Sequence, residues 1–193
     1  MRRALISSAA AALAVLPAGC GNEPTPVPDV GAIPAPDGFR PARYDAQGVR
    51  FRAPTNWRVT PGEGTQLATV AIGDAQVGIW RYPRTEPLPE TEAQLDAARE
   101  ALVAQIKSRD PTFKIKSMRL IMKPGIRAVQ ILGVGTNLTN SKARRSMRSV
   151  HAYGRGAEVV MDAFAPPEAF SRVDRQTFGP MTRSLKLRKP KGA

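Results

Sequence analysis

A proline-rich stretch limits which part of this chain can fold. Prolines occur at positions 24, 26, 28, 34, 36 and 41, among few large apolar side chains. Proline fixes φ and lacks a backbone N–H, so this density excludes helix and central strand and favours an extended polyproline II spacer. At about 3.1 Å per residue, roughly 20 such residues reach about 60 Å. We therefore expect the folded body to occupy residues 44–187, a length that suits one domain.

The segment before the prolines is typical of an export signal. A positively charged start precedes an apolar run over residues 4–16. That run fits a signal-peptide core of ~7–15 residues and falls short of the ~20 needed to cross a bilayer. Small residues, Ala18 and Gly19, stand directly before Cys20. The pattern predicts a lipoprotein signal peptide at residues 1–19, with acyl chains such as palmitate attached to Cys20.

Cys20 is the only cysteine, so neither an internal disulfide nor a cysteine-based metal site can form. Lipidation would consume its thiol. The alternative is an ordinary secretory signal cleaved nearby, which would leave a free thiol, and Pro17 does stand where the lipidation motif more often has leucine. We favour lipidation, with residues 20–43 as lipidated cysteine and tether. Because each buried CH₂ contributes ~0.8 kcal/mol, two or more chains would hold the protein at the extracytoplasmic face of the cell membrane.

Positive charge is concentrated in the second half of the chain. Lys plus Arg number 29 against 16 Asp plus Glu; residues 20–104 hold 8 basic and 11 acidic side chains, whereas residues 105–193 hold 19 and 5. Such an excess indicates an anionic partner or serves solubility. Outside the cell the partner would be anionic lipid or an envelope polymer rather than nucleic acid. The candidate patch for it is Lys142, Arg144, Arg145, Arg148 and Arg155, and a basic, frayed tail is expected at residues 188–193.

The folded body has the pattern of strands interrupted by two helices. Strands are expected at residues 49–52, in hairpins at 67–82 and 147–164, and at 113–122 and 126–133, with a bulge where the alternation changes phase near Ser117. A capping box, Thr91 to Gln94, begins a helix that must end at Asp110 because Pro111 follows. Asp174 is expected to cap the second helix. This order, with no repeated βαβ unit, predicts an α+β fold with a meandering antiparallel sheet.

The segment Phe51-Arg52-Ala53-Pro54-Thr55-Asn56-Trp57 resembles the F-x-x-P-x-x-W opening of the PsbP-like superfamily. The resemblance covers residues 45–187 and, together with Cys20, the chain is similar to the LpqN-type lipoproteins of actinobacteria. It implies an antiparallel sheet between helices, an α/β/α sandwich. Members include a photosystem extrinsic subunit and a regulator of a nuclear GTPase, so the likeness concerns fold rather than chemistry, and it supplies no catalytic residue.

Individual side chains with potential chemistry have simpler explanations. His151 is the only histidine, and no HExxH or GxSxG accompanies it, so a structural or surface role is expected. Three carboxylates spaced along the first helix (Glu92, Asp96 and Glu100) are expected to form a solvated face rather than a cation site. The aromatic side chains of Trp57, Trp80 and Tyr82 could line a pocket, although aromatic residues on a covered sheet are usually core.

The sequence therefore predicts a non-enzymatic, monomeric envelope lipoprotein that binds a partner, with no cofactor, metal or catalytic residue. A carrier of a small hydrophobic or anionic ligand is the alternative, and a hydrolase is the least supported. Structure can separate these hypotheses. A deep apolar cavity beside the sheet would favour the carrier, and a flat patch near the basic loop would favour the binding module. His151 in a cleft with a carboxylate and a hydroxyl would favour an enzyme.

Overall fold

The structure is a computed structural model that describes residues 32–139 and 143–191. Cys20 and Lys142 lie outside these ranges. The elements are, in chain order, β1 (Phe39–Tyr44), a 3₁₀ turn (Asp45–Gln47), β2 (Val49–Pro54), β3 (Arg58–Pro61), β4 (Gln66–Ile72), β5 (Ala75–Pro83), α1 (Glu92–Arg109), β6 (Lys114–Lys123), β7 (Ile126–Gly135), β8 (Arg145–Gly154), β9 (Ala157–Ala165), α2 (Pro167–Val173), a π-helical segment (Asp174–Phe178), α3 (Gly179–Arg183) and β10 (Lys186–Leu187).

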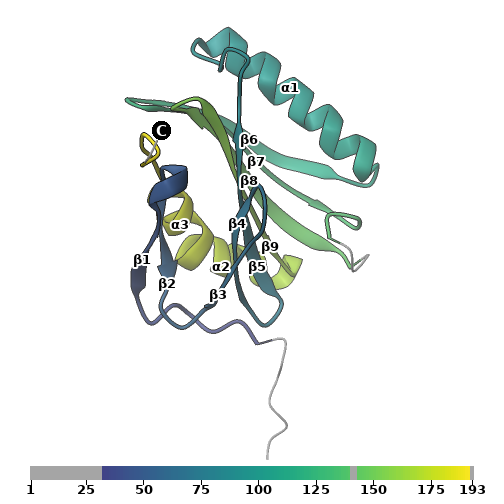
Figure 1. The fold of residues 1–193 in the computed structure, drawn as a ribbon. Helices are drawn as coiled ribbons and strands as arrows, with labels where there is room; N and C mark the ends of the chain where they lie inside the picture. The colour runs from purple at the N-terminus through teal and green to yellow at the C-terminus, as the bar shows by residue number, and fades with distance from the viewer. Residues whose placement is uncertain (1–31, 140–142, 192–193) are drawn as a thin grey trace, which may run out of the picture.

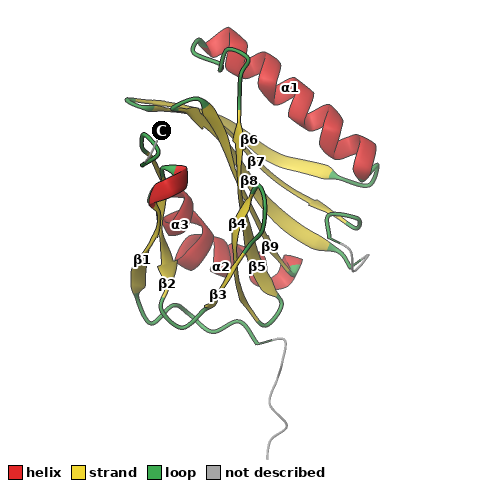
Figure 2. Cartoon of the chain, viewed as in Figure 1, coloured by secondary structure: helices red, strands yellow, loops and turns green. Residues whose placement is uncertain are grey.

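An antiparallel sheet in the order β3-β4-β5-β9-β8-β7-β6 forms the middle of the molecule. Helix α1 lies on one face of it, and α2, α3 and a smaller sheet lie on the other (Figures 1 and 2). The α+β class with helices on both sides of an antiparallel sheet is thus confirmed. Among the helices of the described ranges, none is both long and apolar enough to cross a bilayer.

The smaller sheet, in the order β1-β2-β10, was not anticipated. Its first strand falls within residues 20–43, the segment that the sequence assigned to the tether. Pro41 is compatible with β1 because β1 is an edge strand, where a missing N–H costs no ladder hydrogen bond. Ile33 is also buried, and its carbonyl accepts a hydrogen bond of 2.9 Å from Arg172. The folded body therefore begins before residue 44.

The C-terminal segment is also part of the fold, so the prediction of a frayed tail is wrong up to Lys191. Strand β10 pairs with β2. Beyond it, the Arg188 amide donates to the Gly48 carbonyl at 2.7 Å, and the Lys191 amide donates to the Asp45 carbonyl at 3.0 Å. These main-chain hydrogen bonds hold the basic residues of the tail against the turn between β1 and β2.

Two hydrophobic cores lie on opposite faces of the large sheet. The larger one fills the space between that sheet, α2, α3 and the small sheet, and contains Trp57 packed edge-on against Phe178 at 6.2 Å between ring centroids. The smaller one joins Leu95 and Leu102 of α1 to the outward face of β6, β7 and β8. Because α1 packs on β6 and β7, the outward face of β5 and β9 is left without a covering helix.

Local patterns were predicted well, with one exception. The Thr91 capping box is present, and the register between β6 and β7 shifts between Ile115 and Ser117, as the change of phase indicated. Asp174, however, caps no helix. The helical segment begins at Pro167, whose fixed φ suits the first turn, and continues through Asp174 without a break. Asp174 instead binds Arg148 of β8 through both carboxylate oxygens, at 2.5 and 2.7 Å.

Candidate functional site

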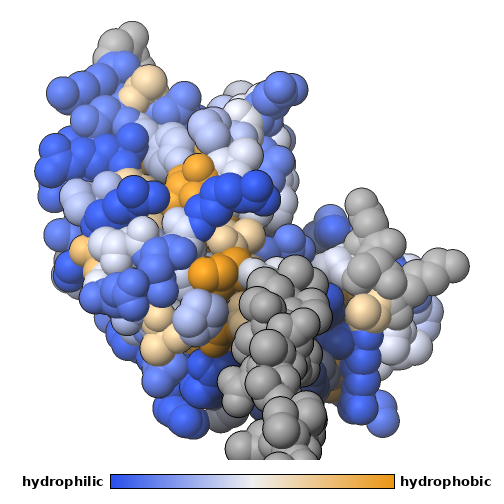
Figure 3. Space-filling model, turned by 90° about the horizontal axis from the view of Figure 1, so that it is seen from below, coloured by the Kyte–Doolittle hydropathy of each residue, from blue (hydrophilic) through white to orange (hydrophobic). Residues whose placement is uncertain are grey.

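The outer surface does not by itself indicate a docking site. On the face shown in Figure 3, the visible surface is mostly hydrophilic, with small hydrophobic spots among charged residues. Monomeric proteins commonly show scattered apolar residues of this kind, which need no functional explanation. The hollows of the molecule are better candidates for a binding site than this face.

A groove of about 700 Å³ lies between the C-terminal half of α1 and the outward face of β5, β8 and β9. We call it the α1 groove. Its volume is within the ~300–1,000 Å³ of small-molecule sites. Apolar side chains from both sides line it, namely Trp80, Leu102, Ile106, Met147, Val160 and Phe164. It exists because α1 covers β6 and β7 but leaves β5 and β9 open.

A strip of polar side chains crosses the floor of the groove. Alternation along β8 and β9 directs Ser149, His151, Glu158 and Asp162 to this face. His151 Nδ1 lies 2.6 Å from Glu158 Oε1, and Arg84 donates to the other oxygen of Glu158. Ser149 Oγ donates to Asp162 Oδ1 at 2.5 Å. The strip thus consists of two hydrogen-bonded pairs on neighbouring strands.

The pKa values of the two carboxyl groups in the strip are shifted in opposite directions. Burial alone would raise the pKa of Glu158, but hydrogen bonds from His151 and Arg84 outweigh it, so the pKa lies below its usual value. Burial dominates at Asp162 and raises its pKa, although the Ser149 hydroxyl acts in the opposite sense. Burial also raises the pKa of Tyr153, next to Glu158. Paired carboxyls pushed apart in this way often mark functional sites.

Replacing Asp162 by asparagine is expected to raise the free energy of unfolding at neutral pH. Because the pKa of the folded-state carboxyl lies above its unfolded value, its contribution to stability is complete below the unfolded pKa and is lost as pH rises through the folded pKa. Asparagine stays uncharged and removes this loss. Urea unfolding measured between about pH 4 and pH 7 should therefore show a flatter profile. Glu158→Gln, which removes a carboxylate with a lowered pKa, should instead destabilise the fold at pH 7.

One rim of the groove is held by Asp110, a buried carboxylate that follows α1. Its Oδ2 accepts hydrogen bonds from the amides of Thr136 (2.8 Å) and Asn137 (3.0 Å), and its Oδ1 accepts from the amide and hydroxyl of Thr112. These bonds outweigh burial and lower the pKa of Asp110. Residues 137–139 line the groove, so Asp110 fixes this rim relative to α1. From the sequence, Asp110 was predicted only to end a helix.

His151 therefore lies in a cleft beside a carboxylate, a position that the sequence analysis did not favour. The Ser149 hydroxyl, two residues away on the same strand, bonds to Asp162, while the imidazole bonds to Glu158. A nucleophilic hydroxyl needs a hydrogen bond to its base, and here the hydroxyl and the imidazole belong to different pairs. The arrangement is suited to hydrogen-bonding a ligand more than to activating a nucleophile.

The acidic residues of α1 lie away from this strip. Asp96 forms an ion pair with Arg99 at 2.9 Å, one turn along the helix. Glu92 and Glu100 are exposed. Within the described ranges, no group of three or more His, Cys, Asp or Glu side chains is placed to hold a metal ion.

The structure does not bring the predicted basic patch together. Arg148 faces the larger core side and binds Asp174 and Gln130, and Arg145 reaches Asp74 at 3.4 Å. Arg144 is exposed at the start of β8, whereas Arg155 lies in the turn at its other end. Ten residues of strand separate these ends, or about 30 Å. Arg155 instead joins basic residues of the C-terminal segment.

No protein-family model matches the sequence, and no curated protein matches it significantly. Among solved structures, cyanobacterial PsbP (CyanoP) from Synechocystis sp. PCC 6803 is similar with a TM-score of 0.60 at 11% identity, over 81% of this chain and 94% of that chain. The Ran-binding protein Mog1p of Saccharomyces cerevisiae gives 0.48 at 8% identity, over 79% and 96%. A protein of unknown function from Pseudomonas aeruginosa (PA94), a putative regulator, gives 0.44 at 15%, over 71% and 89%. At such identities the likeness to CyanoP concerns the fold alone, and this chain has a PsbP-like fold.

Proposed function

We propose that this chain is an LpqN-type lipoprotein, anchored through Cys20 at the extracytoplasmic face of the membrane, and that it is a non-catalytic carrier of a small ligand. Its ligand occupies the α1 groove. The observation that carries this proposal is the groove itself, with apolar walls from α1 and β5 and a fixed polar strip on its floor. A pocket with a few convergent polar groups on an apolar background is the usual form of a ligand site.

The groove favours an uncharged amphiphilic ligand. Its charged side chains offset one another, since Glu158 is bound by Arg84 and His151, and the charge of Arg109, the other cation of the lining, acts on Asp162. Asp162, with a raised pKa, has its charge disfavoured. A charged ligand would lose its hydration on entering the groove, and the side chains of opposite charge that could compensate are already bound to other protein groups. A ligand with one apolar side and one hydrogen-bonding side would contact both Trp80 and the strip around Ser149.

Filling the α1 groove with a bulky side chain tests whether the ligand binds there. Gln105 is exposed on α1 and lines the groove, so Gln105→Trp should block it without disturbing the core. Ala104→Trp introduces the same side chain at an exposed position of α1 outside the groove lining and is the matched control. The full chain with Cys20→Ala allows both variants to be studied without detergent. Binding of the uncharged dye N-phenyl-1-naphthylamine should be saturable, at least about tenfold weaker in Gln105→Trp and unchanged in Ala104→Trp.

Equal binding of the dye by the two tryptophan variants, or no saturable binding by the parent chain, would exclude the groove as the ligand site. A folding control is available in the same samples, because a urea unfolding transition with the midpoint of the parent chain reports an intact fold. Loss of that transition in Gln105→Trp would instead identify unfolding as the cause of weaker binding.

Anchoring has its own test. Cys20→Ala is expected to move the protein from the membrane fraction to the soluble fraction, because the acyl chains supply most of the membrane affinity. Mass spectrometry of the native N-terminal peptide should show an acylated Cys20. Retention of Cys20→Ala on membranes after a high-salt wash would contradict the anchor.

A further inference from the structure

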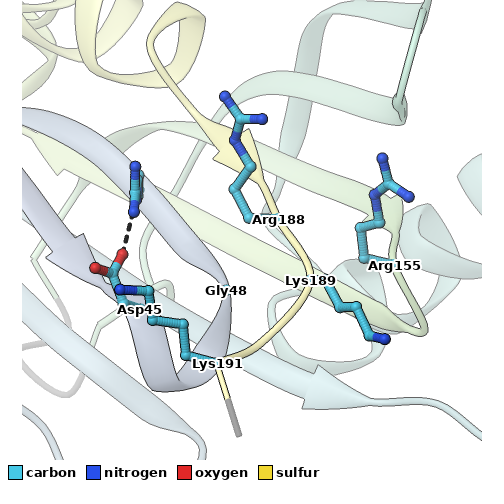
Figure 4. Close-up of a pocket in the computed structure, with 7 residues that line it drawn as sticks. Asp45, Gly48, Arg155, Arg188, Lys189 and Lys191 are labelled. Carbon is cyan, nitrogen blue, oxygen red and sulfur yellow. Dashed lines mark hydrogen bonds and ion pairs between the residues drawn. The ribbon is translucent and has the colours of Figure 1, made fainter. Parts of the chain in front are cut away.

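A second hollow, distinct from the α1 groove, lies where the C-terminal segment crosses the turn between β1 and β2. It has a volume of about 580 Å³. We call it the basic hollow, and its lining residues are Asp45, Gly48, Arg50, Arg155, Arg188, Lys189 and Lys191. They come from three segments far apart in the sequence (Figure 4). In that view the side chains of Arg155 and Arg188 extend to the same side of the C-terminal segment.

The backbone of the basic hollow is fixed. The amide of Arg188 donates to the Gly48 carbonyl and that of Lys191 to the Asp45 carbonyl. Gly48 has a φ of +66°, and a methyl group on it would overlap the carbonyl oxygen of Arg188. Only glycine allows this close crossing of two chain segments. The backbone that carries the cations of the tail is therefore held at the hollow, and the side chains of Arg188, Lys189 and Lys191 extend from it as exposed groups.

Positive charge in the hollow is only partly neutralised. Five cationic side chains line it with one carboxylate, and that carboxylate, Asp45, is bound by Arg50 at 2.7 Å. The hydrogen bond from Arg50, together with the charges of Lys191 and Arg43, lowers the pKa of Asp45. Among the described residues, Arg155, Arg188 and Lys189 form no salt bridge. Holding like charges close together is unfavourable unless an anion enters.

We propose that the basic hollow binds a phosphate-bearing anion that carries more than one negative charge. Guanidinium groups form paired hydrogen bonds to phosphate oxygens, and lysine adds point charge, so this mixture suits phosphate more than a single carboxylate. The volume is large enough for a group with several acceptor oxygens. The proposal does not depend on the ligand of the α1 groove.

The place of the hollow bears on the source of the anion. Strand β1 runs from the side where the described chain begins, at residue 32, toward the turn that forms the hollow (Figure 1). The hollow thus lies at the end of the small sheet remote from the chain entry. On an anchored protein this position favours a soluble or polymeric phosphate over the headgroups of the anchoring membrane. Both a soluble phosphate and a lipid headgroup would offer a phosphate group, and the experiment distinguishes these two sources.

The experiment uses the full chain with Cys20→Ala, so that no acyl group contributes to binding. Calorimetry with inorganic pyrophosphate tests the soluble source. Co-sedimentation with vesicles of cardiolipin, whose headgroup carries two phosphates, and phosphatidylcholine, against phosphatidylcholine alone, tests the headgroup source. Arg155→Gln with Lys189→Gln should weaken binding at least about tenfold. The matched control, Arg144→Gln with Lys116→Gln, removes the same charges at exposed positions outside the hollow and should change binding less than about twofold.

A second pair of variants tests the fixed backbone. Gly48→Ala should release the C-terminal segment and weaken binding, whereas Gly64→Ala has a similar φ of +60° with nothing near its Cβ and should not. Binding of pyrophosphate with this pattern supports the proposal with a soluble source, and binding of anionic vesicles alone with this pattern supports it with a headgroup. If the hollow variants and the control variants weaken binding equally, net charge alone is responsible and the proposal is wrong. The proposal is also wrong if neither pyrophosphate nor the anionic vesicles bind.

Discussion

Replacing Phe178 by alanine is expected to lower the free energy of unfolding by about 3–5 kcal/mol. Phe178 is fully buried and contacts two aromatic rings, Trp57 at 6.2 Å and Phe170 at 6.0 Å between centroids. It joins the helical layer to the loop between β2 and β3. The packing on both sides is rigid, so a cavity left by the phenyl ring cannot easily collapse. Urea unfolding followed by the fluorescence of the two tryptophans, Trp57 and Trp80, would measure the loss.

Two further variants serve as comparisons for the stability loss of Phe178→Ala. Phe178→Leu leaves a smaller cavity and should cost clearly less than alanine. Met118→Ala truncates an apolar side chain that is 43% exposed on β6, and should change stability by less than about 0.5 kcal/mol. A loss below about 1 kcal/mol for Phe178→Ala would mean that the helical layer is not packed against Trp57 as described.

Replacing Asp110 by alanine is expected to cost about 2–4 kcal/mol and to loosen one rim of the α1 groove. The carboxylate accepts hydrogen bonds from three backbone amides, those of Thr112, Thr136 and Asn137. Without it these donors lose their partner, and an unsatisfied buried donor costs about 1–3 kcal/mol. Because residues 137–139 line the groove, binding of the naphthylamine dye should weaken as well. Asp96→Ala, which breaks only an exposed ion pair, should cost less than about 1 kcal/mol.

The Asp110 carboxylate should also make the free energy of unfolding depend on pH in the acid range. The pKa of Asp110 is lower in the folded state, so its contribution is present above the unfolded pKa and is lost as pH falls through the folded pKa. Asp110→Asn removes the titration while keeping one acceptor oxygen. Its free energy of unfolding should therefore fall less than that of the parent chain between about pH 5 and pH 2. An unchanged acid profile would show that Asp110 does not accept these hydrogen bonds in solution.

The elements predicted correctly are those defined by neighbouring residues. The capping box spans only the four residues from Thr91 to Gln94, and the bulge near Ser117 changes an alternation that can be read along one strand. Strands β1 and β10 were missed because neither has such a pattern. The first contains Pro41, and the second is two residues long. Both form strands because they pair with β2. Their own residues do not show this pairing, because it depends on residues elsewhere in the chain.

The candidate sites were harder to predict for a geometric reason. Alternation along β8 shows that Ser149 and His151 share a face, but not that α1 leaves this part of the sheet uncovered. Arg155 was grouped with Arg144 because they are near in sequence, and a ten-residue strand then separates them. The partners of Arg155 are more than thirty residues away along the chain, at Arg188 and Lys189, and only the closed fold brings them together.

The small sheet also has a consequence for how the chain folds during synthesis. Its central strand, β2, pairs on one side with a strand that precedes it and on the other with β10, more than 130 residues later. A chain that emerges N-terminus first must therefore keep one edge of β2 open until nearly the whole domain has appeared. Open strand edges are sites of aggregation, so during synthesis the domain depends on its final segment to close the open edge of β2.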